Sequence, residues 1–372
     1  MANRFESLAA PGVRQLAPYV PGKPPEQLER ELGIKNSIKL ASNENPLGPG
    51  AAAQAALAAA VAGVGLYPDG SGYVLRSRIA ARHGLQLSQV TLGNGSNDIL
   101  VLLAETFLMP ELEAVYSQYA FAVYPLAVQA ASADARVAPA HPADHAMPLG
   151  HDPSAILAAI GPRTRVVFLA NPNNPTGTWM GEQELDVLLR AIPTEVIVVL
   201  DEAYHEYSAA AGVPDGTRWL AQHPNLVVAR TFSKAYGLAG LRIGYALSDP
   251  DIADLLNRVR QPFNVSVAGL AAATAALDDE AHLDATLELN RAGLARLREG
   301  LTALGLGVLP SAANFLLCDL GRPAAPVNEA LLRQGVIVRP LANYGLPNHL
   351  RITTGTAAQN ERVLAAMSTA LA

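Results

Sequence analysis

The chain has 372 residues, half of them apolar, which is more than one compact core usually holds, so we expect two domains. A formal net charge of -6 argues against a nucleic acid or an anionic membrane as partner. The single cysteine, Cys318, excludes a disulfide within the chain and is typical of the reducing cytoplasm. Neither a signal peptide nor an apolar run of membrane-spanning length is evident, so we expect a soluble cytoplasmic protein.

Residues 1–38 are predicted to form an arm that lies on another surface. A short helical stretch comes first, and four prolines between residues 18 and 25 then force an extended path. Tyr19 lies in this extended part, where an aromatic side chain either packs or contacts a ligand. Two later loops, residues 42–49 and 67–72, are turns by composition, and composition alone gives Tyr67 no function.

Short apolar runs near residues 90, 115, 167, 198 and 228 alternate with helical stretches. This alternation predicts an α/β fold whose large domain has a mostly parallel, doubly wound sheet. Only about ten residues separate the run near residue 228 from a further apolar run that begins at Arg242. Because this connection is too short for a crossover helix, we expect that last strand to be antiparallel.

Polar and aromatic residues follow these strands, at the edge where ligands bind to such sheets. Gly95 and Ser96 open a helix after a glycine loop, and free backbone N–H groups there favour an anion. Tyr119 either stacks on a planar ligand or packs in the core. Asn174 belongs to the rigid turn Asn-Pro-Asn-Asn-Pro-Thr-Gly at 171–177, and we expect the Asn174–Pro175 bond to be cis.

The run at residues 195–200 is apolar nearly throughout, as in a central parallel strand, and it leads directly into Asp201 and, three residues later, Tyr204. A carboxylate at the end of a buried strand either caps the next segment or requires a compensating partner. A protonated pyridine nitrogen would be such a partner.

Residues 226–245 bring Thr231, Ser233 and Lys234 to the end of a strand and then lead to Arg242. A lysine that is desolvated among other cations loses basicity and becomes a competent Schiff-base nucleophile. Two hydroxyls and an arginine nearby could hold a phosphate dianion. Schiff base and phosphate together suggest pyridoxal phosphate, whereas the lysine alone would be read as an exposed side chain between two strands.

From residue 249 onward the pattern changes to longer helices and short strands, which predicts a smaller α+β domain. We therefore divide the chain into an arm at 1–38, a large domain at 39–248 and a small domain at 249–372. Arg339 and Arg351 lie in or beside the expected strands of the small domain. Such arginines are either solvated or salt-bridged, or they turn inward to grip a carboxylate or phosphate. No metal site is expected.

Four motifs follow one another along the chain, namely Asn174-Pro175-Thr176-Gly177, Asp201-x-x-Tyr204, Ser233-Lys234 and Gly240-x-Arg242-x-Gly244. In this order they resemble those of the class I and II aminotransferases of fold type I, and the resemblance spans nearly the whole chain. Within that family, Ala-Pro-Tyr-Val-Pro-Gly-Lys at 17–23, Ser-Asn-Glu-Asn-Pro at 42–46, Tyr-Pro-Asp-Gly at 67–70 and Leu-Arg-Ile-Thr at 350–353 look like the histidinol-phosphate aminotransferases.

The resemblance implies pyridoxal phosphate as cofactor, with Lys234 as the Schiff-base lysine and proton shuttle and Asp201 as the partner of the pyridinium nitrogen. Asn174 and Tyr204 would bond to the ring hydroxyl, and Tyr119 would stack on the ring. The cofactor phosphate would be held by Gly95, Ser96, Thr231, Ser233 and Arg242, and by the partner subunit's Tyr67. An obligatory homodimer follows from such sharing.

For the substrates, the resemblance implies ping-pong transfer between L-histidinol phosphate and 2-oxoglutarate. Histidinol phosphate has no carboxylate, so its phosphate must occupy the place where 2-oxoglutarate puts one. Arg351 would serve both anions, helped by Arg339 and Tyr19.

Three alternatives are weighed against this function. Residues 342–348 lie where the family varies, which leaves an aromatic or broad-specificity aminotransferase open. A lyase similar to phosphothreonine decarboxylase would use the same cofactor contacts. A cofactor-binding transcription regulator is disfavoured, because the chain is acidic and has no additional DNA-binding module.

Overall fold

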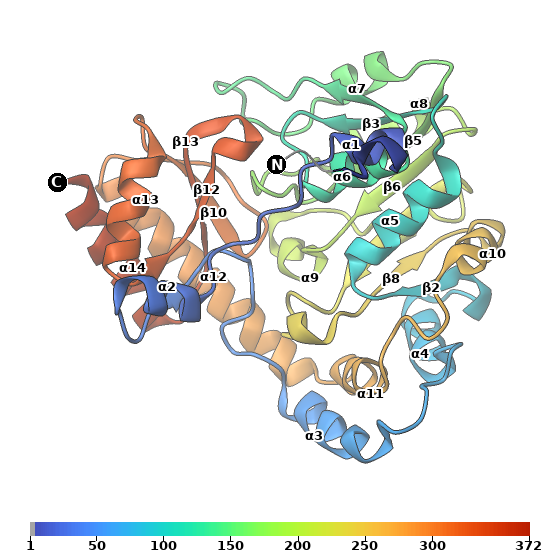
Figure 1. Cartoon of the computed structure of the whole chain (residues 1–372), viewed down its shortest axis with the longest axis horizontal. Coiled ribbons are helices and arrows are strands. Elements are labelled where there is room, and N and C mark those ends of the chain that lie inside the picture. Colours follow the sequence, from blue (N-terminus) through green and yellow to red (C-terminus); the bar gives the residue numbers. More distant parts are fainter. Residues whose placement is uncertain (1–3) are drawn as a thin grey trace.

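A seven-stranded sheet forms the centre of the larger part of the computed structural model, which describes residues 4–372 (Figure 1). The strand order is β2-β8-β7-β6-β5-β3-β4, and only β8 runs antiparallel to its neighbours. The strands are β2 (Val90–Gly93), β3 (Glu113–Ser117), β4 (Asp134–Ala138), β5 (Thr164–Ala170), β6 (Ile197–Asp201), β7 (Leu226–Thr231) and β8 (Gly244–Leu247). The predicted parallel sheet and its antiparallel last strand are therefore confirmed.

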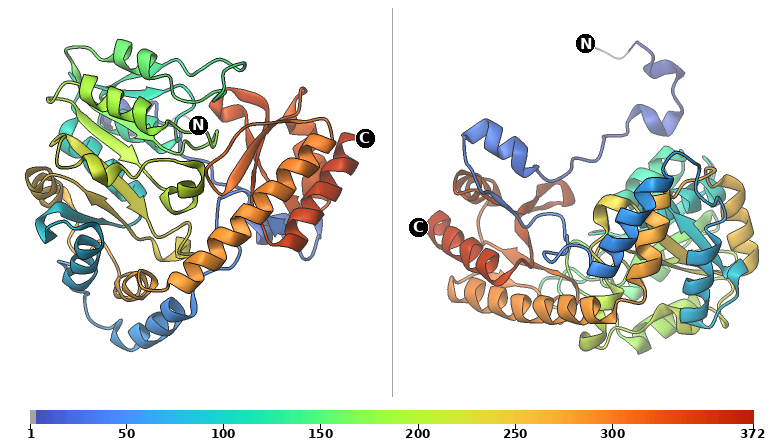
Figure 2. Two further views of the ribbon diagram at one scale, coloured as in Figure 1. Left: turned by 180° about the vertical axis from the view of Figure 1, so that it is seen from behind. Right: turned by 90° about the horizontal axis from the view of Figure 1, so that it is seen from below.

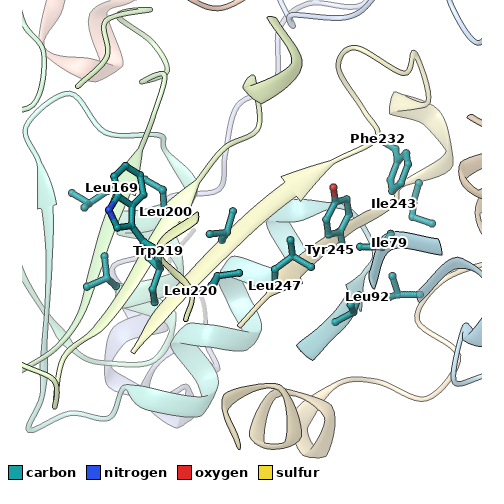
Figure 3. Close-up of a cluster of buried hydrophobic side chains, with 14 of the residues drawn as sticks. Ile79, Leu92, Leu169, Leu200, Trp219, Leu220, Phe232, Ile243, Tyr245 and Leu247 are labelled. Carbon is teal, nitrogen blue, oxygen red and sulfur yellow. The ribbon is translucent and has the colours of Figure 1, made fainter. Parts of the chain in front are cut away.

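Helices cover both faces of this sheet, because successive residues of each buried strand point to opposite sides. One face packs against α5 (Ser96–Phe107), α6 (Val123–Ala130) and α10 (Pro250–Val259). The other face packs against α4 (Tyr73–His83), α7 (Pro153–Ala159), α8 (Glu182–Ala191) and α11 (Val267–Ala276). Figure 3 shows this second core, into which Leu169 of β5, Leu200 of β6 and Ile79 of α4 extend.

A four-stranded antiparallel sheet forms the smaller part, with the order β12-β13-β10-β9. Its strands are β9 (Gly307–Val308), β10 (Phe315–Asp319), β12 (Arg339–Leu341) and β13 (Leu346–Thr353). Helices α12 (Glu280–Ala303), α13 (Ala324–Arg333) and α14 (Ala357–Leu371) pack with it around one core. The expected capping box begins α14, where Thr356 and Gln359 accept each other's backbone N–H.

The N-terminal segment joins the two parts along one side of the molecule (Figure 2). Helix α1 (Pro11–Arg14) lies on α6, where the Gly12 backbone N–H donates to the Ser132 hydroxyl at 3.0 Å. Helix α2 (Pro25–Leu32) belongs to the smaller part, since Leu28 packs against Ile337. Strand β1 (Ile38–Lys39) pairs there with β11 (Val336–Ile337).

Two helices beyond residue 249 pack with the large sheet. Helix α10 contributes Ile252 and Leu256 to one of its cores, and α11 contributes Ala272 and Ala273 to the other. Helix α3 (Ala51–Ala60) lies against α11, and the short α9 (His205–Ser208) follows β6. From this packing we propose that the small domain begins at α12 and includes residues 25–41. No helix within residues 4–372 combines the length and the apolar character needed to cross a bilayer.

Candidate active site

A cavity of about 170 Å³ lies where the carboxyl ends of β5, β6 and β7 face the small domain. These strands deliver Ala170, Asp201 and Thr231 to its wall, and β13 delivers Arg351. Most of the predicted site residues line this one space, namely Tyr19, Ser96, Asn174, Asp201, Tyr204, Thr231, Ser233, Lys234, Arg242 and Arg351. Residues up to 332 positions apart in the sequence therefore meet at the edge of the sheet where ligands were expected.

Lys234 extends its ammonium group to the Ser42 backbone carbonyl, with 3.1 Å between Nζ and the oxygen. Burial lowers the pKa of Lys234 to about 8, and the nearby guanidinium groups of Arg351 and Arg242 add to this effect. The neutral amine is therefore accessible near neutral pH, which a lysine needs to act as a nucleophile or a base.

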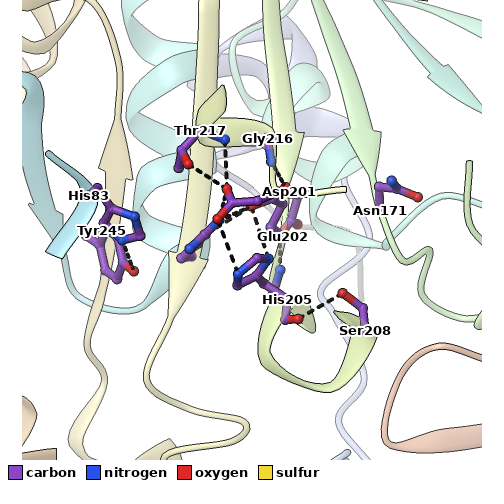
Figure 4. Close-up of polar contacts among 12 residues, drawn as sticks. His83, Asn171, Asp201, Glu202, His205, Ser208, Gly216, Thr217 and Tyr245 are labelled. Carbon is purple, nitrogen blue, oxygen red and sulfur yellow. Dashed lines mark hydrogen bonds and ion pairs between the residues drawn. The ribbon is translucent and has the colours of Figure 1, made fainter. Parts of the chain in front are cut away.

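Asp201 and Glu202 are consecutive buried carboxylates in contrasting environments (Figure 4). Glu202 accepts hydrogen bonds from Arg230 at 2.7 and 2.9 Å and from the Gly216 N–H at 2.7 Å. His205, Asp215 and Glu202 lie close enough together to hold a metal ion, but the Arg230 guanidinium already bonds to both carboxylates. Asp201 forms no ion pair with any side chain in residues 4–372.

Asp201 instead accepts two neutral hydrogen bonds, from the Tyr124 hydroxyl at 2.8 Å and from the Ala203 N–H at 3.2 Å. Asp201 is only 4% exposed. Burial raises the pKa of Asp201 to about 6 in spite of these two bonds. A buried carboxylate that lacks a cation suits a positively charged ligand.

Tyr204 and Asn174 border the same space but already have partners. Asn43 donates to the Tyr204 hydroxyl at 2.7 Å, and Arg351 donates from Nη1 to the Asn174 side-chain oxygen. Burial raises the pKa of Tyr204 to about 12. Tyr204 is therefore a neutral phenol near neutral pH, and its proton is available for a ligand.

The other end of the cavity is suited to an anion. Helix α5 begins there without a side-chain cap, so the N–H groups of Ser96 and Asn97 form no hydrogen bond within residues 4–372. Gly95 has a φ of +87°, a backbone conformation that favours glycine, and it lies close against the Arg242 guanidinium. Arg242 donates to the Ser233 hydroxyl at 3.3 Å, and the Ser233 N–H donates to the Thr231 hydroxyl at 3.1 Å.

Arg339 and Arg351 are direct neighbours across β12 and β13. Like charges in such a position are destabilising, and neither arginine forms an ion pair with a carboxylate of residues 4–372. Arg351 lines the cavity and also donates to the Ala41 carbonyl at 2.7 Å. Arg339 lies one layer behind, with its guanidinium 5.5 Å from the centre of the Tyr19 ring and a 2.9 Å bond to the Val20 carbonyl.

Four predicted site residues do not line this cavity, namely Gly95 and Arg339, described above, and Tyr119 and Tyr67. Tyr119 packs beside Leu309 and Leu317, while Phe121, two residues further on, lines the cavity. Both residues lie in the turn between β3 and α6, where Phe121 also packs edge to face on Tyr124. Tyr67 is 83% exposed and stacks on Phe263 at 4.7 Å, away from the cavity of its own chain.

Other cavity residues were not anticipated from the sequence. Ser42 and Asn43 come from a loop that composition describes only as a turn, and Tyr344 comes from the variable stretch at 342–348. Phe121 could have been suggested by its position shortly after a buried strand. The Asn174–Pro175 bond is cis as expected, and the Asn171–Pro172 bond is cis as well.

Comparison with known proteins gives the site its context. The family model "Aminotransferase class I and II" matches residues 35–367. A curated relative, histidinol-phosphate aminotransferase 2 of Pseudomonas fluorescens Pf-5, is 57% identical over 374 residues and all of both chains. The crystal structure of histidinol-phosphate aminotransferase from Sinorhizobium meliloti in complex with pyridoxal-5'-phosphate is 30% identical, with a TM-score of 0.89 over 100% of this chain and 98% of that one.

A single mutant of Thermus thermophilus aspartate aminotransferase, 24% identical, shares the fold with a TM-score of 0.84 over 97% of this chain and 99% of its own. The family match covers nearly the whole chain, and the cavity collects the motif residues that the sequence shares with that family. The chain therefore belongs to the class I and II aminotransferases and has their fold type I architecture.

Proposed function

We propose that this aminotransferase transfers an amino group between L-histidinol phosphate and 2-oxoglutarate in histidine biosynthesis, with pyridoxal phosphate as its cofactor. The observation that carries the substrate assignment is the pair of adjacent, carboxylate-free arginines, Arg339 and Arg351, beside the cavity that holds Lys234. Relatives that are 50 to 57% identical over nearly the whole chain bear the name of this activity.

The residues of the cavity fit the proposed cofactor at both ends. Asp201 is a buried carboxylate without a cation, which matches a protonated ring nitrogen. The uncapped start of α5, with Gly95 against Arg242 and with Ser233 and Thr231 nearby, matches a phosphate. Asn174 and Tyr204 would hold the ring hydroxyl between these ends, and Phe121 rather than Tyr119 would contact the ring face.

Pyridoxal phosphate supplies an electron-withdrawing ring that stabilises negative charge at the substrate carbon. Lys234 would bond covalently to the cofactor and, once released, would take a proton from the substrate and return it at a different atom. The lowered pKa of Lys234, about 8, suits both tasks because the amine has to lose and regain a proton near neutral pH. Asp201 would keep the ring nitrogen protonated.

The central test is an assay of the purified protein with 2-oxoglutarate and three amino donors: histidinol phosphate, phenylalanine and phosphothreonine. We expect the highest kcat/KM for histidinol phosphate. Preference for phenylalanine would make the protein an aromatic aminotransferase. Release of carbon dioxide from phosphothreonine would make it a lyase, and either result would overturn the proposal.

The two arginines are expected to divide the recognition of the substrates. A guanidinium binds a carboxylate or a phosphate bidentately, but the additional charge of a phosphate dianion calls for a second cation. Arg351→Ala should therefore slow both half-reactions, whereas Arg339→Ala should affect histidinol phosphate far more than 2-oxoglutarate. Each lost charge-assisted contact should cost about 1.5 to 3 kcal/mol, or at least tenfold in kcat/KM.

Single-turnover kinetics of the two half-reactions separate these effects. Arg322→Ala is a suitable control, because this exposed arginine donates to the Leu371 carbonyl and does not line the cavity. Equal losses on both substrates for Arg339→Ala would refute the division between the arginines. Full turnover of histidinol phosphate in both active-site variants would refute the anion site itself.

We further propose that two copies of the chain form a dimer in which the partner subunit's Tyr67 reaches the cofactor phosphate. Tyr67 stacks on the exposed Phe263, and Val61, Val64 and Leu66, shortly before it in the chain, are exposed apolar residues as well. Such a cluster is typical of a surface that another protein covers. Tyr67 is exposed and does not line the cavity of its own chain, which is consistent with a role at the partner subunit's cavity.

Mixed dimers test this sharing. Tyr67→Phe should weaken cofactor binding by about tenfold through loss of one hydrogen bond to a charged group. In a dimer of one Tyr67→Phe chain and one Lys234→Ala chain, the site that retains Lys234 would regain an intact Tyr67, so tight binding should return at that site. Sedimentation velocity should show a dimer for each variant. A monomer, or mixed dimers without recovery, would contradict the sharing.

A further inference from the structure

We propose that Tyr124 is a positioning residue that holds Asp201 in its ionised, cofactor-ready state. This inference rests on the proposed cofactor and adds a residue that the motifs do not contain. Tyr124 lies in the first turn of α6, 77 positions before Asp201 in the sequence.

The contact between the two side chains is direct and enclosed. The Tyr124 hydroxyl donates to Asp201 Oδ2 at 2.8 Å, and the tyrosine residue is 0% exposed. The Tyr124 ring stacks on Phe168 at 5.0 Å with 12° between the planes, so Phe168 of β5 holds it against the sheet. The phenol therefore has little freedom to turn away from the carboxylate.

A hydrogen bond from a neutral phenol favours the charged form of a carboxyl group. The groups that face Asp201 are Tyr124, Glu202, Lys234 and Tyr204, together with the Ala203 N–H. Burial raises the pKa of Asp201, and the Tyr124 bond is the largest effect that opposes this rise. Lys234 also opposes it, but more weakly, and Glu202 reinforces it.

Tyr124 also contacts a second residue of the cavity wall. Its ring meets Phe121 edge to face, with 5.9 Å between centres and 89° between planes. Phe121 lines the cavity, so one short stretch at the start of α6 supplies a ring to the cavity wall and a hydroxyl to the carboxylate. Fixing Asp201 Oδ2 in this way leaves the remaining lone pairs of the carboxylate for the ring nitrogen.

The test is Tyr124→Phe, which removes one oxygen and retains the ring packing. Cofactor is titrated into depleted wild-type and variant protein at several values of pH between 5 and 9, and the dissociation constant is measured by fluorescence. Below the pKa of Asp201, binding must ionise a carboxyl group that has lost its donor, so we expect the variant to bind at least about tenfold more weakly. At high pH the carboxylate is already ionised before binding, so the difference should shrink.

Tyr116→Phe is the matched control, because Tyr116 lies in the same core, and the hydrogen bonds that Asp201 accepts come from Tyr124 and Ala203 instead. We expect it to bind cofactor like the wild type at every pH, and thermal unfolding should show that both variants are folded. A purely structural role for Tyr124 would weaken binding equally at all pH values, and that result, or no weakening at all, would overturn the inference. If wild-type protein itself bound no pyridoxal phosphate, the proposed function would fail instead.

Discussion

Lys234→Ala is expected to abolish transamination and to remove the absorbance of lysine-bound cofactor. The chain has only four lysines, and the other three, Lys23, Lys35 and Lys39, all lie in the first 39 residues. None of them follows a strand of the large sheet, whereas Lys234 lies three residues beyond β7 in the cavity wall. No other lysine is therefore positioned to take over the reaction. Loss of covalent catalysis and of the proton shuttle together should reduce kcat by several orders of magnitude.

Absorbance spectra and 2-oxoglutarate-dependent turnover of the purified variant check this result. Lys39→Ala is the appropriate control, because Lys39 lies near the cavity but forms an ion pair with Glu44 at 2.7 Å. The control should retain the spectrum of the wild type. A Lys234→Ala protein with normal turnover would end the cofactor assignment.

Asp201→Asn should still bind cofactor but lose activity on the order of a hundredfold or more. A neutral amide cannot stabilise a protonated ring nitrogen, and Glu202, the nearest other carboxylate, is occupied by Arg230. Steady-state kinetics and the cofactor dissociation constant separate the two effects. Near-normal kcat would show that Asp201 does not support the ring.

The same substitution should stabilise the cofactor-free protein at neutral pH. The pKa of Asp201 rises from 3.8 to about 6 on folding, so its contribution to stability is full below pH 3.8 and disappears as the pH rises through 6. The difference corresponds to about 3 kcal/mol. Urea unfolding without cofactor should therefore show Asp201→Asn to be more stable than wild type at pH 7.5. The difference in the free energy of unfolding should be smaller near pH 4.5. An advantage independent of pH would contradict this titration.

The large sheet could be predicted from the sequence because its inner strands are buried on both faces. Strands β5, β6 and β7 are apolar runs of this kind, and the short link after β7 indicated the direction of β8. Strand β4 was not expected. It is an edge strand, Asp-Ala-Arg-Val-Ala, that pairs only with β3. Because four of its residues are exposed, its sequence lacks the hydrophobic pattern of a buried strand. The attachment of α10 and α11 to the large sheet is likewise decided by tertiary packing.

The residues of the candidate site could likewise be predicted only in part. Asp201, Asn174 and Lys234 could be predicted because each lies at the end of a recognisable strand or within four residues of it, and the topology brings strand ends together. Phe121 and Tyr124 could not be chosen over Tyr119, because the choice depends on how α6 turns after β3. Asn43 could not be predicted either, since its bonds to Tyr204 and Thr353 connect residues more than 160 positions apart.

Arg351 illustrates how folding prepares a binding group in advance. Its guanidinium is already held at two points, by the Ala41 carbonyl and by the Asn174 side chain, before any substrate enters. A free arginine side chain would lose up to about 2 kcal/mol of rotamer entropy when it grips an anion. Here most of that freedom is already lost in the folded protein, so more of the contact energy remains as affinity. Because Asn174 follows β5 of the seven-stranded sheet and Arg351 lies in β13 of the four-stranded sheet, the incoming anion also meets a receptor whose two halves are already aligned.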